Sequence, residues 1–477
     1  MTVSSVAEGG LTLSGRGRPP FRIHGLSPAL ADALNRMVPG EADERLAASV
    51  LGAEGPAALS HWHSTLHVLA QAGLLVVSAR TGGELLASLI PIAPSFVLAF
   101  GEPDLTRAYV ASRFAYARVR EGSVILESPL SFARIVLHDS RGIGLFYATA
   151  RPGRAAEVVR RVSGLSEQAA LILLALLHEA GMIGEVSSDG TTADDRNTWL
   201  RTWEFHDLLF HARSRLGRHD SAAGATYQHR GISPPPALRP SVFRETIALE
   251  RPDLSALMQQ SASLAAVQEA RRSVRTYGAQ PITARQLGEF LHRVARVKEQ
   301  HSVEMATPDG PLRMEVTTRP YPSGGALHEL EVYPVVNACE GLAPGLYRYD
   351  PLEHRLEVVA GVTPEVEELL VDASSAVGMA AKDVQILLIV AARFQRVSWK
   401  YSTFAYAMTL KHVGVLLQTM YLTAADMGLA PCALGAGNAD VFSRVAGTDY
   451  TEESSVGEFL LGSGNPVGLS LPTTQNP

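Results

Sequence analysis

The chain has 477 residues, a net charge of −6 and 19% charged residues. This length predicts several domains, and the composition excludes a disordered chain and nucleic-acid binding through a large positive charge. The two cysteines, Cys339 and Cys432, cannot form a disulfide framework, so we expect a reducing compartment. The apolar stretches 83–100 and 170–183 contain Pro, Glu or His, and the N-terminus does not resemble a signal peptide. We therefore expect a soluble cytoplasmic protein without a membrane partner.

An internal repeat marks the first half of the chain. The segment LHVLAQAGLLVV at 66–77 aligns with LALLHEAGMIGEV at 174–186. Each copy is typical of a helix that ends at a glycine and continues into a short strand, as in a winged helix. Strands predicted at 123–126 and 133–137 would extend the sheet of the second copy. The repeat therefore predicts two winged-helix-like domains in tandem.

The charge of the two candidate recognition helices argues against DNA. Residues 61–72 and 166–180 contain no Arg or Lys, whereas DNA binding needs several cations on that face. The same fold can bind an extended peptide by adding a strand to a sheet edge, or can serve as a spacer or dimerisation arm. His61 and His63 point to different faces of their helix, so no metal site is predicted.

A loss of periodicity after a helix predicted at 199–216 indicates a domain junction. Residues 217–240 are rich in Gly, Ser, Ala and Pro, which favours a junction or a long functional loop. The predicted organisation is winged-helix-like domains at 1–110 and 111–198, a connecting helix and linker at 199–262, and an α+β domain at 263–477.

Two motifs of the C-terminal domain contain residues suited to a ligand site. The sequence RRSVR at 271–275 lies where a helix ends, and its arginines can offer fork-shaped donors to a phosphate. The sequence PSGG at 322–325 predicts a tight turn whose two glycines allow the backbone to approach a flat ligand closely. The other elements predicted here are a helix capped by Thr283, a short helix at 326–330, and strands at 331–336, 345–359 (a hairpin), 385–392 and 458–462.

The longest periodic segment runs from Trp399 to Gly428 and predicts a long helix. Ser402 or Thr403 is the candidate N-cap, and Gly428 is the candidate left-handed residue at the C-terminus. Because the opposite face is also apolar, we expect a central core helix or a dimer-interface helix. The apolar residues spaced along one face are Tyr406, Leu410, Val413, Leu417, Met420, Ala424 and Met427.

Five motifs in this order, RRSVRTY, PSGGALHELEVY, WKY, GLAPCALGAGN and FLLGSG, resemble those of the nitroreductase-like flavoproteins. Within that group the chain is similar to the SagB-type azoline dehydrogenases over roughly residues 265–470. The resemblance implies a homodimer that binds FMN at its interface and oxidises thiazolines or oxazolines of a ribosomal precursor peptide to azoles. An azoline-containing precursor peptide and a cyclodehydratase complex are the implied partners.

The same resemblance implies a cofactor-binding role for individual residues. The first motif would hold the phosphate and ribityl chain, the glycine turn of the other subunit would line the isoalloxazine, and Gln418 with a small-residue loop would lie near the flavin ring. The residues are Arg271, Arg272, Ser273 and Arg275; Pro322, Ser323, Gly324 and Gly325; and Gln418, Leu434, Gly435 and Ala436. Many relatives carry an Arg or Lys after the last strand, whereas this chain reads GSGNP at 462–466, so the phosphate contact would depend more on the first motif.

The catalytic candidates are Lys400 and Tyr401, directly before the long helix. Azoline oxidation removes a proton from the carbon alpha to the amide and a hydride from the neighbouring ring carbon, and the protein must supply the base. Burial lowers the pKa of a lysine and a neighbouring ammonium lowers that of a tyrosine, so either residue could be the base. From the residues alone, a surface lysine and a packing tyrosine are the alternative.

Two other functions remain open at this level. An NAD(P)H-dependent nitro or quinone reductase would use the same flavin core but would not need the first 240 residues or the Lys-Tyr pair. A non-catalytic peptide-binding subunit would retain only the function of the N-terminal domains.

Overall fold

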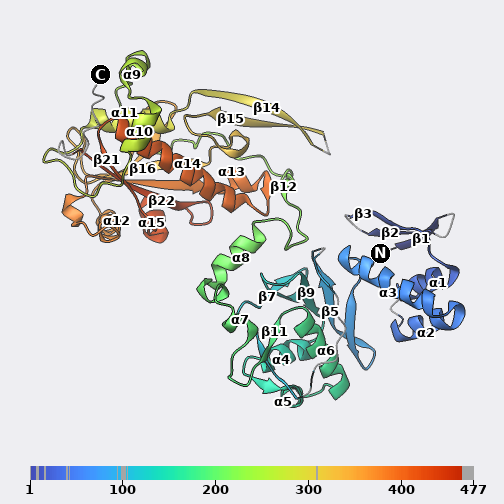
Figure 1. Cartoon of the computed structure of the whole chain (residues 1–477). Helices are drawn as coiled ribbons and strands as arrows, with labels where there is room; N and C mark the ends of the chain where they lie inside the picture. The colour runs from blue at the N-terminus through green and yellow to red at the C-terminus, as the bar shows by residue number, and fades with distance from the viewer. Residues whose placement is uncertain are drawn as a thin grey trace, which may run out of the picture. The chain divides into compact units, whose positions relative to one another are not determined.

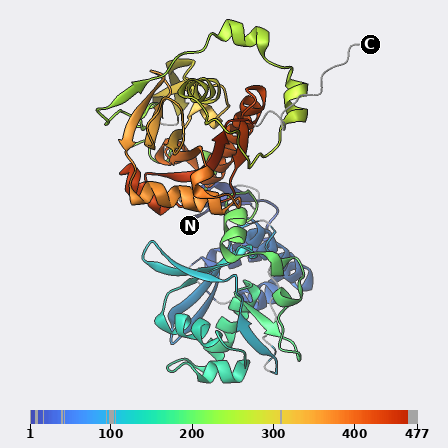
Figure 2. The same ribbon diagram turned by 90° about the vertical axis from the view of Figure 1, so that its left-hand side faces the viewer.

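The computed structural model describes residues 2–6, 10–15, 18–38, 41, 43–93, 95–97, 104, 106–307 and 310–464. The chain forms two compact units, Met1–Ser221 and Ala222–Pro477 (Figures 1 and 2). The boundary between the units falls inside the predicted junction 217–240. The sequence GSGNP at 462–466 replaces the Arg or Lys that many relatives carry. Its last two residues, Asn465 and Pro466, are outside the described residues.

The N-terminal part of unit 1 combines a three-stranded antiparallel sheet with three helices. The strands are β1 (Thr2–Val6), β2 (Gly10–Gly15) and β3 (Arg18–Ile23), and the helices are α1 (Pro28–Met37), α2 (Asp43–Glu54) and α3 (Pro56–Gln71). Helix α1 begins after Ser27, whose hydroxyl accepts the Leu30 N–H, with Pro28 in the first turn. Trp62 of α3 is fully buried and donates a hydrogen bond to Asp43 at 2.9 Å, so the centre of the His-Trp-His sequence is a core residue.

The rest of unit 1 contains two more sheets, and helices pack against them. The five-stranded sheet has the order β4 (Val77–Thr81), β5 (Glu84–Pro91), β9 (Ala133–Leu137), β8 (Ser123–Glu127) and β7 (Tyr116–Arg120). The three-stranded sheet has the order β10 (Gly153–Arg154), β6 (Ala108–Ala111) and β11 (Ile183–Val186). The helices are α4 (Ser140–Ala148), α5 (Ala155–Arg160), α6 (Glu167–Glu179), α7 (Ala193–Arg196), η1 (Leu200–Thr202) and α8 (Phe205–Arg213).

The repeated order of helix, glycine and strand is confirmed. Gly73 after α3 and Gly181 after α6 have left-handed φ angles of 67° and 65°, and β4 and β11 follow them. Strand β5 pairs with β9, so one sheet crosses residue 110, where the two winged-helix-like domains were predicted to meet. The winged-helix assignment itself stays a prediction. The helix predicted at 199–216 is shorter, because Trp203 and Glu204 are extended between η1 and α8.

Unit 2 is built on a seven-stranded sheet in which every neighbouring pair is antiparallel. Its order is β13 (Thr246–Ala248), β18 (Arg355–Ala360), β17 (Gly345–Asp350), β16 (Leu330–Val336), β19 (Ile386–Arg393), β22 (Glu453–Gly462) and β21 (Ala430–Ala433). The predicted central strand is confirmed as β19, in which every residue is buried. Alternate residues of β19 face opposite cores, so both faces of the sheet are covered.

Four helices cover the two faces of this sheet (Figure 1). Helices α11 (Ala284–Ala295) and α14 (Ala405–Asp426) pack on one face, where Phe290, Leu416 and Leu388 of β19 belong to the same hydrophobic core. Helices α12 (Pro364–Ser375) and α15 (Ala439–Ala446) pack on the other. The remaining elements of unit 2 are β12 (Gly224–Ala225), α9 (Leu254–Gln260), α10 (Leu264–Ala270), β14 (Glu299–Thr307), β15 (Gly310–Thr318), η2 (Gly324–Ala326), η3 (Ala381–Asp383), α13 (Gln395–Ser398) and β20 (Tyr401–Ser402).

The long helix exists, but two details of its prediction were wrong. Helix α14 begins at Ala405 after Phe404, because Ser402 is part of strand β20 and Thr403 has a positive φ of 74°. Its buried stripe is Thr409, His412, Val413, Leu416, Met420, Thr423 and Ala424, whereas Tyr406 and Leu410 are 48% and 38% exposed. The hydropathy pattern predicted the wrong set of buried residues because three of those that are buried, Thr409, His412 and Thr423, are polar.

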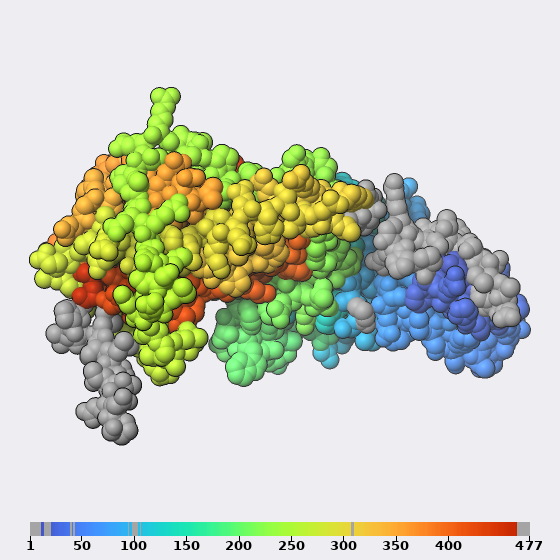
Figure 3. Space-filling view, turned by 90° about the horizontal axis from the view of Figure 1, so that it is seen from above, coloured from blue at the N-terminus to red at the C-terminus, as the bar shows by residue number. Residues whose placement is uncertain are grey.

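Local predictions elsewhere in unit 2 are mostly confirmed. Thr283 caps α11 and forms a capping box with Gln286. The hairpin at 345–359 is β17 and β18. The short helix predicted at 326–330 is wrong, because the chain makes a single 3₁₀ turn and enters β16 at Leu330. Strands β14 and β15 form a long hairpin, which is yellow on the surface in Figure 3. Among the described residues, no helix combines the length and apolarity needed to cross a bilayer.

Candidate active site

Lys400 and Tyr401 lie in the short connection between α13 and α14, and their side chains converge on the PSGG turn. The Lys400 Nζ atom lies 2.8 Å, and the Tyr401 hydroxyl 3.0 Å, from the position that a Cβ atom on Gly325 would occupy. Lys400 is only 9% exposed. Two motifs that are 75 residues apart along the chain therefore form one site, and only glycine leaves room for both side chains at position 325.

The surroundings of the two candidate bases shift their pKa values in opposite directions. Burial, helped by the nearby Arg396 guanidinium, lowers the pKa of Lys400 below its ordinary value. Burial raises the pKa of Tyr401, and the neighbouring Tyr227 acts in the same direction. The idea that an adjacent ammonium would lower the pKa of Tyr401 is therefore wrong, because burial has the larger effect. Lys400 is therefore the better candidate for the base.

The backbone around this site is held in unusual conformations. Gly325, Ala326 and His328 have φ angles of 65°, 56° and 45° in the PSGG loop, and Thr403 next to Tyr401 has 74°. A non-glycine residue in this region costs free energy, and such residues persist where surrounding contacts hold them. The strain indicates that the shape of this loop is fixed by its neighbours.

A buried pair, His412 and Glu329, supports the PSGG turn. The Gly324 N–H donates to His412 Nε2 at 2.8 Å, so the other ring nitrogen, Nδ1, carries the proton and donates to Glu329 Oε1 at 2.7 Å. Glu329 is fully buried and His412 nearly so. Neither residue was predicted from the sequence. A histidine within the periodic segment 399–428 was a signal that could have indicated His412. Its partners, Glu329 and Gly324, lie 83 and 88 residues away along the chain.

A second buried cation, Arg396, lies behind Lys400. Its guanidinium has no exposed surface and donates to three backbone carbonyls: Leu327 at 2.9 Å, Pro235 at 2.7 Å, and Glu315. Burial and the nearby Arg393 lower the pKa of Arg396 to about 10, so it remains charged at neutral pH. This fixed positive charge favours the neutral form of Lys400.

The predicted phosphate residues lie at the other end of α14. Helix α10 ends at Ala270, and the segment 271–275 continues beside β21, where the Val274 N–H donates to the Pro431 carbonyl at 2.7 Å. The Ser273 hydroxyl is 2.7 Å from the Tyr421 hydroxyl of α14. Within the part of the chain that the structure describes, the guanidinium groups of Arg271, Arg272 and Arg275 have no hydrogen bond or ion pair. The Arg271 guanidinium lies over the Tyr421 ring, 5.3 Å from its centre. Arginines without an ion pair can offer their donors to a phosphate.

The small-residue loop after β21 is joined to the same group. The Tyr421 hydroxyl also accepts the Ala433 N–H at 2.8 Å, immediately before Leu434. The Leu434 N–H donates to the Glu458 carbonyl at 2.9 Å and is therefore engaged. Gly435 and Ala436 are exposed, and so is Gln418 on α14. The exposed backbone of Gly435 and Ala436 is therefore better placed than Leu434 to contact a ligand.

Within one chain the predicted residues form two groups rather than one. The Lys400, Tyr401 and PSGG group contacts α14 near His412, whereas the arginine group contacts it at Tyr421. Nine residues of helix separate these contacts, which is about 14 Å along the axis. Tyr406, Leu410 and Gln418 lie on the exposed side of the same helix. The arginine group and the exposed backbone of Gly435 and Ala436 could hold a ligand that carries a phosphate, and within one chain the PSGG group is not part of this place.

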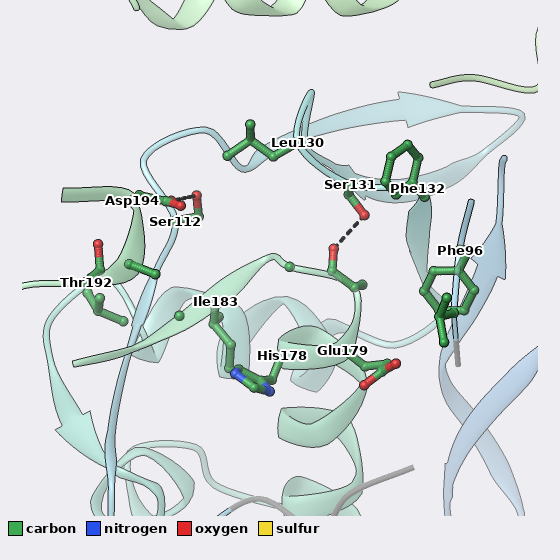
Figure 4. A pocket seen from close by; sticks show the side chains of 16 residues that line it. Phe96, Ser112, Leu130, Ser131, Phe132, His178, Glu179, Ile183, Thr192 and Asp194 are labelled. Carbon is green, nitrogen blue, oxygen red and sulfur yellow. Dashed lines mark hydrogen bonds between the residues drawn. The ribbon is translucent and has the colours of Figure 1, made fainter. Parts of the chain in front are cut away.

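Unit 1 contains a separate cavity of about 400 Å³ between the C-terminus of α6 and strand β11 (Figure 4). Phe132, Leu130 and Ile183 supply apolar lining. The Ser131 hydroxyl donates to the Ala180 carbonyl at 2.6 Å, and the Ser112 hydroxyl donates to Asp194 at 2.8 Å. No group of three or more His, Cys, Asp or Glu side chains suited to a metal ion occurs among the described residues.

Two family models match the chain, one in each unit. Residues 269–463 match the Nitroreductase family, and residues 109–220 match the family described as Cyanobactin oxidase ThcOx. A Methanocaldococcus jannaschii protein provisionally named nitroreductase MJ1384 is 28% identical over 193 residues, which cover 40% of this chain and 85% of that protein. Unit 2 is nitroreductase-like. Both matched families are named for oxidoreductases, which supports the expectation that this chain is an oxidoreductase.

Solved structures also align with about half of the chain. A Ralstonia eutropha protein, provisionally named a nitroreductase, is 20% identical with a TM-score of 0.35 and covers 51% of this chain and 99% of its own. A chain of the E. coli microcin synthetase McbBCD complex, with truncated pro-MccB17 bound, is 19% identical with a TM-score of 0.33. That alignment covers 46% of this chain and 84% of the other.

Proposed function

We propose that the protein is an FMN-dependent azoline dehydrogenase that acts on a ribosomally synthesised peptide. The observation that carries this proposal is the convergence of Lys400 and Tyr401 on Gly325 in a nitroreductase-like unit. A buried lysine with a lowered pKa suits removal of a weakly acidic carbon-bound proton. A reductase that takes hydride from NAD(P)H has no such requirement.

The reaction converts a thiazoline or oxazoline ring to the aromatic azole with loss of two hydrogens. Lys400 takes the proton from the carbon alpha to the amide, and the electron pair of that C–H bond becomes part of the new double bond. Bound FMN supplies the acceptor for the hydride that leaves the neighbouring ring carbon, and oxygen regenerates the oxidised cofactor. Tyr401 is protonated at neutral pH because burial raises its pKa, so its role is to orient the ring by donating a hydrogen bond.

We assign the phosphate of FMN to Arg271, Arg272 and Arg275, with Ser273 beside them. Gly435 and Ala436 supply backbone to the ring edge, and Leu434 supports the loop. The PSGG turn of a second copy, together with Gln418, lines the ring, so the working form is a homodimer. The exposed side of α14 and the distance between the two groups within one chain support this arrangement.

We assign peptide binding to unit 1. Strand β11 is the last strand of its sheet among the described residues, which leaves an edge for an added strand, and the cavity of Figure 4 lies beside it. The match of residues 109–220 to an oxidase of peptide-derived cyanobactins supports the assignment. A cyclodehydratase, which makes azolines, is the enzyme that would act before this one.

The decisive experiment mixes the FMN-loaded protein with an azoline-bearing precursor peptide and follows the flavin spectrum and the peptide mass. Bleaching of the flavin, its recovery in air and the loss of two hydrogens from the peptide are expected. Bleaching only by NAD(P)H would indicate a reductase. A bound peptide with no flavin and no mass change would indicate a non-catalytic subunit.

A further inference from the structure

The segment 222–239, here called the strap, precedes the nitroreductase-like match and follows the cyanobactin oxidase match, so neither family model includes it. Its first part pairs with the connection that carries the candidate base. Gly224 and Ala225 form antiparallel strand β12 against Tyr401 and Ser402. The Tyr227 N–H then donates to the Lys400 carbonyl at 3.2 Å. The backbone from the Lys400 carbonyl to Ser402 is therefore held by the strap.

Buried arginines fix the second part of the strap. Arg396 donates to the Pro235 carbonyl at 2.7 Å, and Arg393 donates to the carbonyls of Pro236 and Ala237 at 3.1 and 3.0 Å. Arg239 forms an ion pair with the buried Glu453 at 2.8 Å. The prolines provide no N–H, but their carbonyls are the acceptors that these arginines need. The strap is thus an integral part of unit 2 and not a loose connection.

Tyr227 is the strap residue that enters the lysine site. The centre of its ring is 6.0 Å from Lys400 Nζ, and the Tyr401 ring lies at 5.3 Å from the same atom. The Tyr227 ring packs edge-on against the buried Trp399, and its hydroxyl donates to the Met305 sulfur at 3.3 Å. The residue holds a strained φ of 50°. The ring is therefore fixed by Trp399 and by the hydrogen bond of its hydroxyl to Met305.

The charged and titratable groups near Lys400 are few. Arg396 approaches from α13, Tyr401 from the same connection and Tyr227 from the strap, while the PSGG loop presents the backbone of Gly325. His412 and Glu329 bond to each other, and His412 also accepts the Gly324 N–H of that loop. No carboxylate within the described residues forms an ion pair with Lys400. Aromatic rings thus take the place that a counter-ion would occupy.

We propose that Tyr227 is a positioning residue of the lysine site, and that its ring forms a wall that keeps water from Lys400 Nζ. The catalytic meaning of this wall rests on the proposed function, but the wall itself does not. Removing the ring admits water, and hydration favours the charged form of a lysine. The ring, not the hydroxyl, is required, because the hydroxyl is used only toward Met305.

The test measures the protonation of Lys400 directly and needs neither FMN nor peptide. The chain contains only four lysines, Lys298, Lys382, Lys400 and Lys411, so an acylating reagent gives labelled peptides that mass spectrometry assigns without ambiguity. The rate of acetic anhydride labelling at Lys400 is recorded against pH for wild type, Tyr227→Phe and Tyr227→Ala. The other three lysines are exposed and serve as internal references.

We expect the labelling midpoint of Lys400 to move upward by about one pH unit in Tyr227→Ala and to stay in place in Tyr227→Phe. An unchanged midpoint in a folded alanine variant, or an equal shift in the phenylalanine variant, would overturn the proposal. If alanine prevents folding, Tyr227→Leu replaces it and should give a smaller upward shift. An unmoved midpoint in this variant would likewise refute the wall.

Azoline oxidation is the second readout. In Tyr227→Ala the acidic limb of the pH–rate profile, on which the rate falls as Lys400 becomes protonated, should move upward with the labelling midpoint, and the rate at pH 7 should fall about tenfold. In Tyr227→Phe both the limb of the pH–rate profile and the rate at pH 7 should equal those of the wild type. If the wild type shows no azoline oxidation but its labelling midpoint responds as expected, the proposed function fails and the structural role of Tyr227 stands.

Discussion

The amine of Lys400 lies 2.8 Å from the point at which a Cβ atom on Gly325 would stand. This contact predicts the effect of adding a single methyl group. Gly325→Ala should push the flexible Lys400 side chain out of position and lower azoline oxidation at least tenfold, while the protein still folds. Alanine in a left-handed conformation costs only about 1 kcal/mol, which most domains tolerate.

Gly428 offers a matched control for this substitution. Its φ of 66° equals that of Gly325 within one degree, and nothing lies within 4 Å of its would-be Cβ. Gly428→Ala should therefore carry the same backbone cost and keep the activity. Equal activity losses in both variants, measured with the azoline peptide alongside thermal unfolding, would mean that strain and not the contact is responsible.

The second prediction separates the two candidate bases. Lys400→Met should slow azoline oxidation by about 10²–10⁴, the usual effect of removing a general base. Tyr401→Phe should slow it less than about tenfold, because the raised pKa of Tyr401 leaves it a hydrogen-bond donor. Both variants should keep FMN. Lys298→Met, which changes an exposed lysine outside both groups of candidate site residues, is the control. A larger loss in Tyr401→Phe would reverse the assignment.

The third prediction is a pH dependence. Lys400 acts as a base only when neutral, so the rate should be full above its pKa in the folded protein and should fall as the pH decreases through that value. Because this pKa is lowered from the ordinary value of 10.5, the limb should lie below 10.5. Arg396 contributes to the lowering, so neutralising it with Arg396→Met should move the limb upward. A limb that stays in place would exclude an electrostatic role for Arg396.

Much of unit 2 could be predicted because its sequence determines its elements locally. The strand β19, the hairpin of β17 and β18, the cap at Thr283 and the left-handed Gly428 each depend on residues within a few positions. The positions of the site motifs were also predictable from their order along the chain, although their roles stay predictions.

The rest depends on contacts between distant residues. His412 is buried because Glu329 and Gly324 satisfy its two nitrogens, and a hydropathy pattern assigns a histidine to the surface. The strap lies within residues 217–240, which were predicted as a domain junction or a long functional loop because of their Gly, Ser, Ala and Pro content. The arginines that hold it, Arg393 and Arg396, lie more than 150 residues later in the chain. No local pattern in either segment contains this pairing.

The fourth prediction concerns the cofactor. Arg275→Ala should weaken FMN binding, because a charge-assisted phosphate contact contributes about 1.5–3 kcal/mol, which is roughly a tenfold to hundredfold change in dissociation constant. Flavin fluorescence during titration measures it. Arg285→Ala is the control, since Arg285 is also exposed but lies on α11 near Glu250, at 3.6 Å. Wild-type protein that stays colourless after reconstitution would refute the FMN site itself.

The last prediction is the homodimer. Leu410 lies on the exposed side of α14, two residues before His412, so a second copy packed there would bury it. Leu410→Glu would then bury an uncompensated charge in each subunit, at a cost of about 3–5 kcal/mol per charge. The dimer should dissociate more than a hundredfold more readily, at roughly 1.4 kcal/mol per tenfold.

Sedimentation velocity at micromolar concentration measures this dissociation, and flavin content should fall with it, because the PSGG turn of one copy is proposed to line the ring held by the other. Val371→Glu on α12 is the control, since Val371 is 50% exposed but lies on the other face of the sheet. It should leave both dimer and flavin unchanged. A wild type that sediments as a monomer with FMN bound would mean that one chain completes the site alone. The distance of about 14 Å between its two groups would then have to be closed by a movement within unit 2.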